Sequence, residues 1–552
     1  MNLKISMHLK ITKTRYKGKI SRYGKIIETY RENGKIKQKI IRNIGNIKTN
    51  EDEKRAEGLL NSLQSGEKLI SINEINYENF LEYGMIYVTE KLLEKYGIKR
   101  CLGVMNGKER IDIVKIITLL IANRLYRPSS DLDVVEWINE EAYADIKVQP
   151  QHIYRTLDKL IKYKGTIEKS LFEELKKNCK LNLKIALYDL TSAYFEGNGS
   201  ESADYGYSRD HRRDRKQIVI GLVMCDGIPI MHEIFEGNTV DKITLKEMVN
   251  KLKQRLGLKT PIFVADRGLI TENNIETLNE EEYNYILGCP RRNNNVSEEL
   301  LIKEVKTSEK QDSIEVKKEE YEFKNRKYQR RYILCIDKNT RKERLYKLQD
   351  MISDTEKKLK ELQTAYIKSQ ESKKGKKISR DSLMLKASKI LGKNKRLFNI
   401  EFDNGLKFSP NKENLEYEKQ IAGKFLLVTN TDLDSKKVMK TYKDLKEVEN
   451  AFRNLKSFVK LRPIYHWKDR RVNAHIFVCV QSFLIKCLIK KAVKSLKISP
   501  GKAIRKINRI KVANIKIEDE EYLFTNKLNK EQKAIFSALQ IAIPPKTIPQ
   551  NL

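Results

Sequence analysis

The 552-residue sequence predicts an α/β fold with a mixed sheet at its core. The first observation is three β-rich runs, "KIALYDLTSAYF", "KQIVIGLVMC" and "IPIMHEIF", within residues 184–235. Asp226-Gly227, a dipeptide typical of tight hairpins, separates the last two runs. The second observation is that two helix–strand units follow: the helix "DKITLKEMVNKLKQRLG" precedes the strand "PIFVAD", and a helix from about Thr271 precedes "YNYILGCP".

The element order is therefore β-β-β-α-β-α-β. Hairpins make the first three strands antiparallel, and helical crossovers make the later strands parallel to the first. This is the order of a ribonuclease H-like sheet. The order also makes the first and fourth strands neighbours in the sheet, and each of them carries an aspartate.

The charge of the chain indicates a polyanionic partner. The sequence has 110 Lys and Arg against 74 Asp and Glu, which gives a net charge of +36. Nucleic acid is the partner that such a charge favours. The alternative is an AT-rich genome, which raises the lysine content of all its proteins.

Cysteine spacing and hydropathy favour a cytoplasmic protein without a membrane anchor. The seven cysteines are scattered and show no zinc-binding spacing, as expected of reduced thiols. The N-terminus lacks the apolar run of a signal peptide. The longest uncharged apolar run, "AHIFVCVQSFLI" at 474–485, is too short for a bilayer and predicts a buried helix.

Changes in pattern along the chain divide it into six regions. Asn33-Gly34 predicts a hairpin near the start, and residues 291–424 combine β-rich runs, a long charged helix and the low-complexity loop "SKKGKK". The helix after Pro150 carries a polar face that would suit either DNA or solvent. We expect a small β-hairpin region (1–50), a helical DNA-binding region (51–180), the first part of the sheet core (181–290), an insertion domain (291–424), the second part of the core with the Glu449 helix (425–498) and a C-terminal tail (499–552).

Three acids are candidates for a metal site. Asp189 lies within the first strand, Asp266 ends the fourth strand, and Glu449 lies on a later helix. Carboxylates that converge repel one another unless a cation neutralises them, and Mg²⁺ prefers such oxygen ligands. Three acids can hold two ions about 4 Å apart for phosphoryl transfer. Each acid alone also has a structural interpretation. Asp189 could be paired with an arginine, Asp266 could cap a helix or a turn, and Glu449 could form an ion pair with Arg453.

The segment "TYKDLKEVENAFRNLKS" predicts one amphipathic helix that carries the third acid. Leu445 and Val448 begin its apolar stripe. Tyr442 and Lys456 lie seven residues before and after Glu449, close to two helical turns, so one helix would align all three. Arg453 would join them, and ordinary ion pairing is the alternative reading.

These motifs resemble bacterial insertion-sequence transposases with an Asp-Asp-Glu triad, of the insertion-sequence-four-like superfamily. "YDLTSAYFEG", "EGNTVDKIT", "VADRGLIT" and "LRPIYHWKDRRVNAHI" carry the resemblance from about Asp189 onward. Tyr442, Glu449 and Lys456 match the spacing of that group's Tyr-x2-Arg-x3-Glu-x6-Lys motif. Leu445 stands where the motif has Arg, and Lys446 is a candidate to replace it.

The resemblance implies cleavage at the 3′ ends of the element and attack of the freed hydroxyl on target DNA, with a hairpin route for the second strand left open. It implies two Mg²⁺ ions, with Mn²⁺ possible, held by Asp189, Asp266 and Glu449. It also implies double-stranded DNA partners, the terminal inverted repeats and the target, bound by a homodimer on paired ends. The candidate DNA-binding residues are Tyr442, Lys446, Arg453, Lys456, Arg212, Arg213 and Arg267.

Two other functions fit parts of the pattern. A ribonuclease H-like nuclease or junction resolvase would cut DNA without joining it, and a DNA-binding regulator would keep the fold without the chemistry. The complete acid triad argues against the regulator. The basic N-terminal region and the insertion argue against a small resolvase. Tyr442 could instead pack in the core, and the basic segment 205–217 could be a solvated loop that does not bind DNA.

Overall fold

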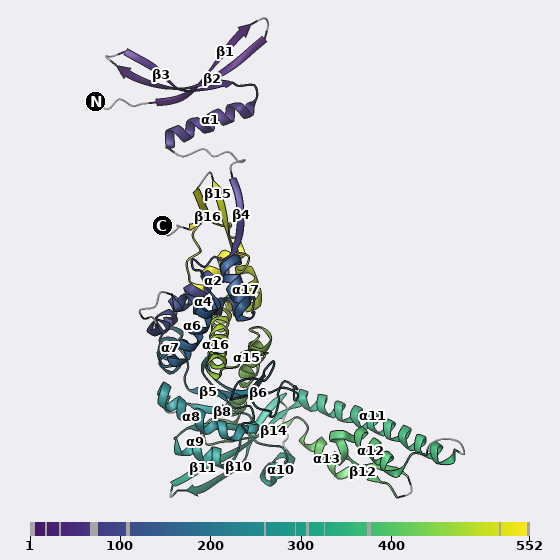
Figure 1. Cartoon of the computed structure of the whole chain (residues 1–552). Coiled ribbons are helices and arrows are strands. Elements are labelled where there is room, and N and C mark those ends of the chain that lie inside the picture. Colours follow the sequence, from purple (N-terminus) through teal and green to yellow (C-terminus); the bar gives the residue numbers. More distant parts are fainter. Residues whose placement is uncertain are drawn as a thin grey trace. The chain divides into compact units, whose positions relative to one another are not determined.

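The computed structural model describes residues 6–16, 19–32, 35–66, 75–105, 107, 111–258, 261–292, 294–304, 309–324, 326–372, 377–403, 405–517 and 520–548 (Figure 1). The chain forms two compact units. One unit comprises residues 1–81, 511–527 and 545–552, and the other comprises 82–510 and 528–544. These units extend across the expected boundaries at residues 50 and 499, because strands from both chain ends pair within one unit.

The smaller unit contains two antiparallel sheets. Three strands form the first, in the order β1-β2-β3, and α1 packs against it. The second has the order β17-β16-β15-β4. The region expected to hold a hairpin thus has three strands, while the Asn33-Gly34 turn lies outside the described residues. The bounds are β1 Ser6–Tyr16, β2 Lys19–Glu32, β3 Lys35–Asn46, α1 Asn50–Ser65, β4 Ile75–Glu82, β15 Lys511–Ile517, β16 Glu520–Thr525 and β17 Thr547–Ile548.

An eight-stranded mixed sheet is the core of the larger unit, with the order β10-β11-β14-β9-β8-β5-β6-β7. From β5 to β9 the elements follow the expected order β-β-β-α-β-α-β, which confirms the ribonuclease H-like α/β class. The bounds are β5 Ile185–Tyr194, β6 Gln217–Cys225, β7 Ile228–Phe235, α8 Asp241–Leu256, β8 Ile262–Ala265, α9 Glu272–Glu280, β9 Asn284–Gly288, α10 Asn295–Ile302, β10 Gln311–Phe323, β11 Arg326–Asp337 and β14 Lys424–Thr429.

The register of the sheet places the two aspartates beside each other. β5 is antiparallel to β6 and parallel to β8, as the sequence predicts. Tyr188 pairs with Ala265 at the end of the parallel stretch. Asp189 and Asp266 are the next residues on their strands, so both emerge at the carboxyl edge of the parallel strands, where ligands bind in such sheets.

The insertion is shorter than expected, because β10 and β11 belong to the core sheet. β11 pairs with β14 in antiparallel register, with Arg331 opposite Thr429 and Ile336 opposite Lys424. Its buried residues Ile333, Leu334 and Cys335 contribute to the sheet core. The inserted part follows β11 and comprises α11 (Lys338–Glu371), α12 (Arg380–Leu391), β12 (Phe398–Glu401), β13 (Lys407–Pro410) and α13 (Lys412–Ile421).

The inserted part has its own hydrophobic core around Leu359, Leu383 and Leu397. The Asn411 side chain caps α13 by accepting a hydrogen bond from the Asn414 backbone N–H at 2.9 Å. Most of the "SKKGKK" loop lies outside the described residues.

A long helix, α16 (Asp469–Ala492), connects the sheet with the helical part of the larger unit. It contacts β7 as well as α4 and α6. It is long and apolar enough to cross a membrane, but 94% of its apolar window is buried inside the protein, as in a core helix. The helical part comprises α2 Gly84–Lys95, α3 Ile98–Leu102, α4 Ile113–Tyr126, α5 Asp131–Glu136, α6 Pro150–Lys162, α7 Lys164–Cys179, α17 Pro500–Ile507 and α18 Lys530–Leu539.

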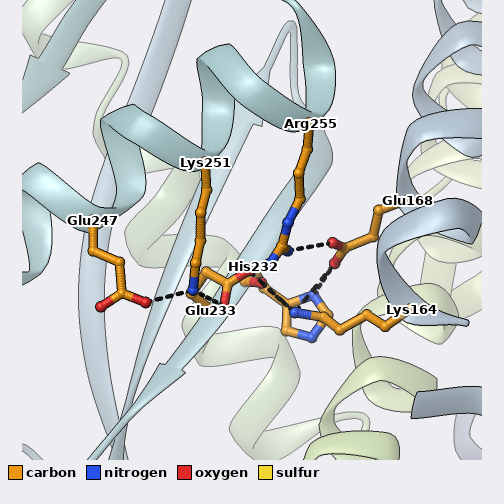
Figure 2. A network of polar contacts seen from close by, with 7 residues as sticks. All are labelled: Lys164, Glu168, His232, Glu233, Glu247, Lys251 and Arg255. Atoms are coloured by element: carbon orange, nitrogen blue, oxygen red, sulfur yellow. Dashed lines mark hydrogen bonds and ion pairs between the residues drawn. The ribbon is translucent and has the colours of Figure 1, made fainter. Parts of the chain in front are cut away.

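A buried ionic network joins α7, β7 and α8 (Figure 2). Arg255 bonds Glu168 at 3.0 Å, and Lys251 bonds Glu233 at 2.8 Å. Lys164 lies 3.3 Å from the carboxylate of Glu233. Burial alone would raise the pKa of Glu233, but these three cations together lower it to about 2. The network therefore keeps a buried carboxylate charged and fixes the helices against the sheet edge.

Candidate active site

Asp189 and Asp266 differ in their surroundings. Asp189 is half-buried within β5 and accepts a hydrogen bond from the Leu190 backbone N–H at 2.8 Å. Asp266 is exposed where β8 ends and a single turn begins. The hydroxyl of Tyr442 donates a 2.7 Å hydrogen bond to the Asp266 carboxylate. The aspartate that faces solvent thus has a fixed orientation.

Glu449 lies on a different helix from Tyr442, so the expected single helix is wrong. α14 ends at Lys443, and α15 runs over Lys446–Ser457. Between them the chain tightens into i→i+3 bonds, from the Leu445 N–H to the Tyr442 carbonyl at 3.1 Å and from the Val448 N–H to the Leu445 carbonyl at 2.9 Å. Seven-residue spacing therefore does not align Tyr442 with Glu449. A shared pocket brings them together instead.

All three acids line one pocket of about 410 Å³, together with Tyr442 and Lys446. Burial, and the negative charges of Asp266 and Glu449, raise the pKa of Asp189 to about 7 despite its bond from Leu190 and the nearby Arg209. Converging carboxylates of this kind suit a divalent cation, which removes their repulsion. Within the described residues, no three His, Cys, Asp or Glu side chains already lie close enough to hold a metal together.

The expected DNA-binding cations occupy different positions. Lys446 and Arg267 line the pocket, and Arg453 is exposed on α15. Lys456 instead points inward, where it and Arg462 bind Asp210 at 2.9 and 3.0 Å. As the structure stands, Lys456 is a buried partner of the 205–217 segment rather than an exposed phosphate ligand.

The two arginines of that segment also differ. Arg212 forms two hydrogen bonds to Asp214, at 2.9 and 2.8 Å, and its guanidinium lies 5.1 Å from the centre of the Tyr194 ring. Arg213 is exposed. Of the two, Arg213 is therefore the more open to a DNA backbone.

Several pocket residues were not predicted from the sequence. Arg291 follows β9, and Asp337 and Arg344 belong to the end of β11 and the start of α11. They were not predicted because residues 291–424, which contain all three, were expected to form an insertion separate from the core sheet. The run "RRYILCID" carried the signal, since its apolar stretch ends at an acid much as "PIFVAD" does.

The comparisons with known proteins fit this geometry. Residues 181–482 match the model of the transposase DDE domain, and residues 9–71 match the N-terminal domain of IS1634 family transposases. The chain belongs to the DDE transposase family. No curated protein matches it in sequence.

Membership of the DDE transposase family makes the chain a DNA-cutting and strand-transferring enzyme and implies dependence on a divalent metal. A cryo-EM structure of a piggyBac transposase synaptic complex with hairpin DNA is 9% identical, over 76% of this chain and 77% of that one. Its TM-score of 0.35 is too low to support any argument about this transposase.

Proposed function

We propose that Asp189, Asp266 and Glu449 are the catalytic acids with which this transposase cuts the ends of its insertion sequence and joins them to target DNA. The observation that supports this most strongly is the register of β5 and β8, which sets two aspartates side by side at the mouth of the pocket that Glu449 also lines. The motif spacing around Glu449 points to the Tyr-Arg-Glu-Lys group of transposases.

The same three acids are the proposed ligands of the metal, which is Mg²⁺ as two ions, with Mn²⁺ as a substitute. When bound, the metal supplies activation of the attacking oxygen and neutralisation of charge on the phosphate. The protein contributes orientation. Tyr442 holds one Asp266 oxygen by its 2.7 Å bond and leaves the other oxygen available as a ligand.

The proposed DNA partners are the terminal inverted repeats and the target duplex, held by a homodimer on paired ends. Lys446, Arg267, Arg453 and Arg213 contact phosphates from around the pocket, while Tyr442 acts mainly through Asp266. Lys456 and Arg212 act indirectly, because their acidic partners order the basic segment beside the site. The enzyme works in the cytoplasm, in keeping with its free cysteines.

Single substitutions of the acids test the proposal. Asp189→Ala, Asp266→Ala and Glu449→Ala should each abolish cleavage of a labelled duplex that carries the inverted repeat, while binding of that duplex stays nearly intact. Glu447→Ala, an exposed acid near the start of the same helix as Glu449, is the matched control and should cleave normally. An acid variant that still cleaves would remove that residue from the site.

A further inference from the structure

Three arginines line the pocket beside the acids: Arg267, Arg291 and Arg344. Arg267 follows Asp266 in the chain, and Arg344 reaches the pocket from the second turn of α11, in the inserted part. In the part of the chain that the structure describes, none of their guanidinium groups makes a hydrogen bond or ion pair. None of these three arginines therefore forms an ion pair with the acids of the same pocket.

The position of Arg344 is fixed by the way α11 begins. Asp337 caps the helix by accepting from the Thr340 N–H at 3.0 Å, and its other oxygen accepts from Gln311 at 2.7 Å. Gly423, with φ at +72°, lets the core sheet approach this first turn, since a Cβ there would lie 2.6 Å from the Asp337 carbonyl oxygen. The insertion helix is therefore anchored to the core just before it presents Arg344.

Arg267 and Arg344 lie close enough to affect each other. Burial and the positive charge of Arg267 lower the pKa of Arg344. Glu418 acts on Arg344 in the opposite direction, and both arginines are exposed to solvent. Two guanidinium groups that face one space repel each other, and an anion between them removes that repulsion. A phosphate that lies between the two guanidinium groups would therefore be attracted by both.

The residue that the family motif would use for this purpose is absent. Leu445 takes the place of the motif's Arg, and it is only 7% exposed. Leu445 and Arg344 line the same pocket, although Arg344 belongs to the inserted part and Leu445 follows that part in the sequence. A cation from α11 is thus available in the pocket where the motif residue is apolar.

We propose that Arg344, together with Arg267, forms a binding site for a DNA phosphodiester next to the three acids, and that the insertion thereby adds a guanidinium to a pocket in which Lys446 is the other candidate to replace the motif's Arg. A guanidinium can bind two phosphate oxygens at once, which suits a strand that must be held in line for attack. The inference rests on the proposed function, since it takes DNA as the ligand of this pocket.

Binding without chemistry provides the test. The full-length protein is titrated, in EDTA, with duplexes of its terminal inverted repeat in which single phosphates are replaced by neutral methylphosphonates. We expect Arg344→Ala to weaken binding of the unmodified end about 10-fold, which is the usual effect of losing a charge-assisted bond. One methylphosphonate near the cleavage site should weaken binding of the duplex by wild type by a similar factor. The same replacement should hardly change binding by Arg344→Ala.

Two further variants keep the result interpretable. Lys347→Ala, an exposed cation on the same helix outside the pocket, should bind and respond like wild type. Arg344→Lys keeps the positive charge but lacks the guanidinium that binds two oxygens at once, so its affinity for the duplex should lie between those of wild type and Arg344→Ala. The inference is overturned if Arg344→Ala matches wild type at every modified phosphate. Because no cleavage is measured, this outcome is independent of whether the three acids are catalytic.

Discussion

At the scale of single residues, the hydrogen bond between Tyr442 and Asp266 is the most informative contact of the site. The Tyr442 ring stacks on Phe425 with ring centres 5.9 Å apart. A Cβ added at Gly288 would lie 2.3 Å from the Tyr442 hydroxyl oxygen, so the glycine leaves room for that hydroxyl. The tyrosine thus packs in the core, one of the two roles that the sequence left open, and its hydroxyl binds an acid of the site.

Removal of this hydroxyl should reduce catalysis without unfolding the protein. In Tyr442→Phe the ring keeps its stacking on Phe425, but Asp266 loses a hydrogen bond to its charged form, which is worth about 2 kcal/mol. We expect the cleavage rate to fall roughly 10- to 30-fold. Thermal unfolding and end binding should remain as in wild type. Unchanged cleavage would mean that Asp266 needs no orientation by Tyr442.

The residues that were predictable from the sequence are those placed by regular strands. Asp189 follows from an acid inside an apolar strand, Asp266 from an apolar run that ends at an acid, and the strand order predicts that the two are neighbours, as the structure has them. The pairing of Lys456 with Asp210 was not predictable, because it depends on how a loop of 205–217 folds back across a distant helix. Arg344 was missed for a similar reason, since no local pattern indicates which residues an insertion returns to the pocket.

At the scale of elements, the interruption between α14 and α15 shows why helix spacing misled. The apolar stripe continues through Leu445 and Val448, so periodicity alone indicates one helix. The i→i+3 bonds at Asp444 and Leu445 interrupt the regular helix, while apolar residues of both parts stay buried. Hydrophobic periodicity thus predicted the buried face correctly but not the continuity of the helix.

Buried histidines on two elements make the stability of the larger unit depend on pH. His232 on β7 faces Lys164, Glu168, Glu233 and Arg255, and burial first, then the cations, hold its pKa well below 6.5.

The pKa of His475 on α16 is also held well below 6.5, by burial first and then by Arg124 and His466. His475 also lies beside Cys479 and the Leu461 carbonyl. In the folded protein both histidines are therefore neutral near pH 6, whereas in the unfolded chain they take up protons.

Stability should consequently fall as the pH drops through 6.5. Each histidine whose folded pKa is depressed costs about 1.4 kcal/mol at pH 5.5 relative to high pH. Urea unfolding at pH 7.5 and 5.5 measures the loss. His475→Gln should reduce the difference between the two pH values, while His211→Gln, on an exposed loop, should leave it unchanged. If His211→Gln reduced the difference and His475→Gln left it unchanged, the pH dependence would not come from His475.

At the scale of the whole molecule, the large positive charge should govern DNA binding. A net charge of +36 implies many contacts between Lys or Arg and phosphates, each of which releases counterions from the duplex. We expect the logarithm of the affinity to fall linearly with the logarithm of salt concentration, with a slope of magnitude about 5 or more. Fluorescence anisotropy from 50 to 300 mM salt measures the slope, and a nearly flat dependence would contradict this role for the charge.

The core sheet, rather than the separate regions expected along the chain, is what brings the site together. Its strands come from both sides of the inserted part, and the inserted part begins directly at the pocket. The central claim is that this pocket both cuts and joins DNA, which distinguishes a transposase from a nuclease or resolvase of the same fold.

Strand joining from a pre-cut end tests that claim most directly. A labelled duplex that ends in the free 3′-hydroxyl of the inverted repeat is incubated with supercoiled plasmid and Mg²⁺, and labelled plasmid is measured. We expect joined product with the wild-type protein and none with Asp266→Ala. Cleavage of an uncut end by wild type without any joining of the pre-cut end would contradict it.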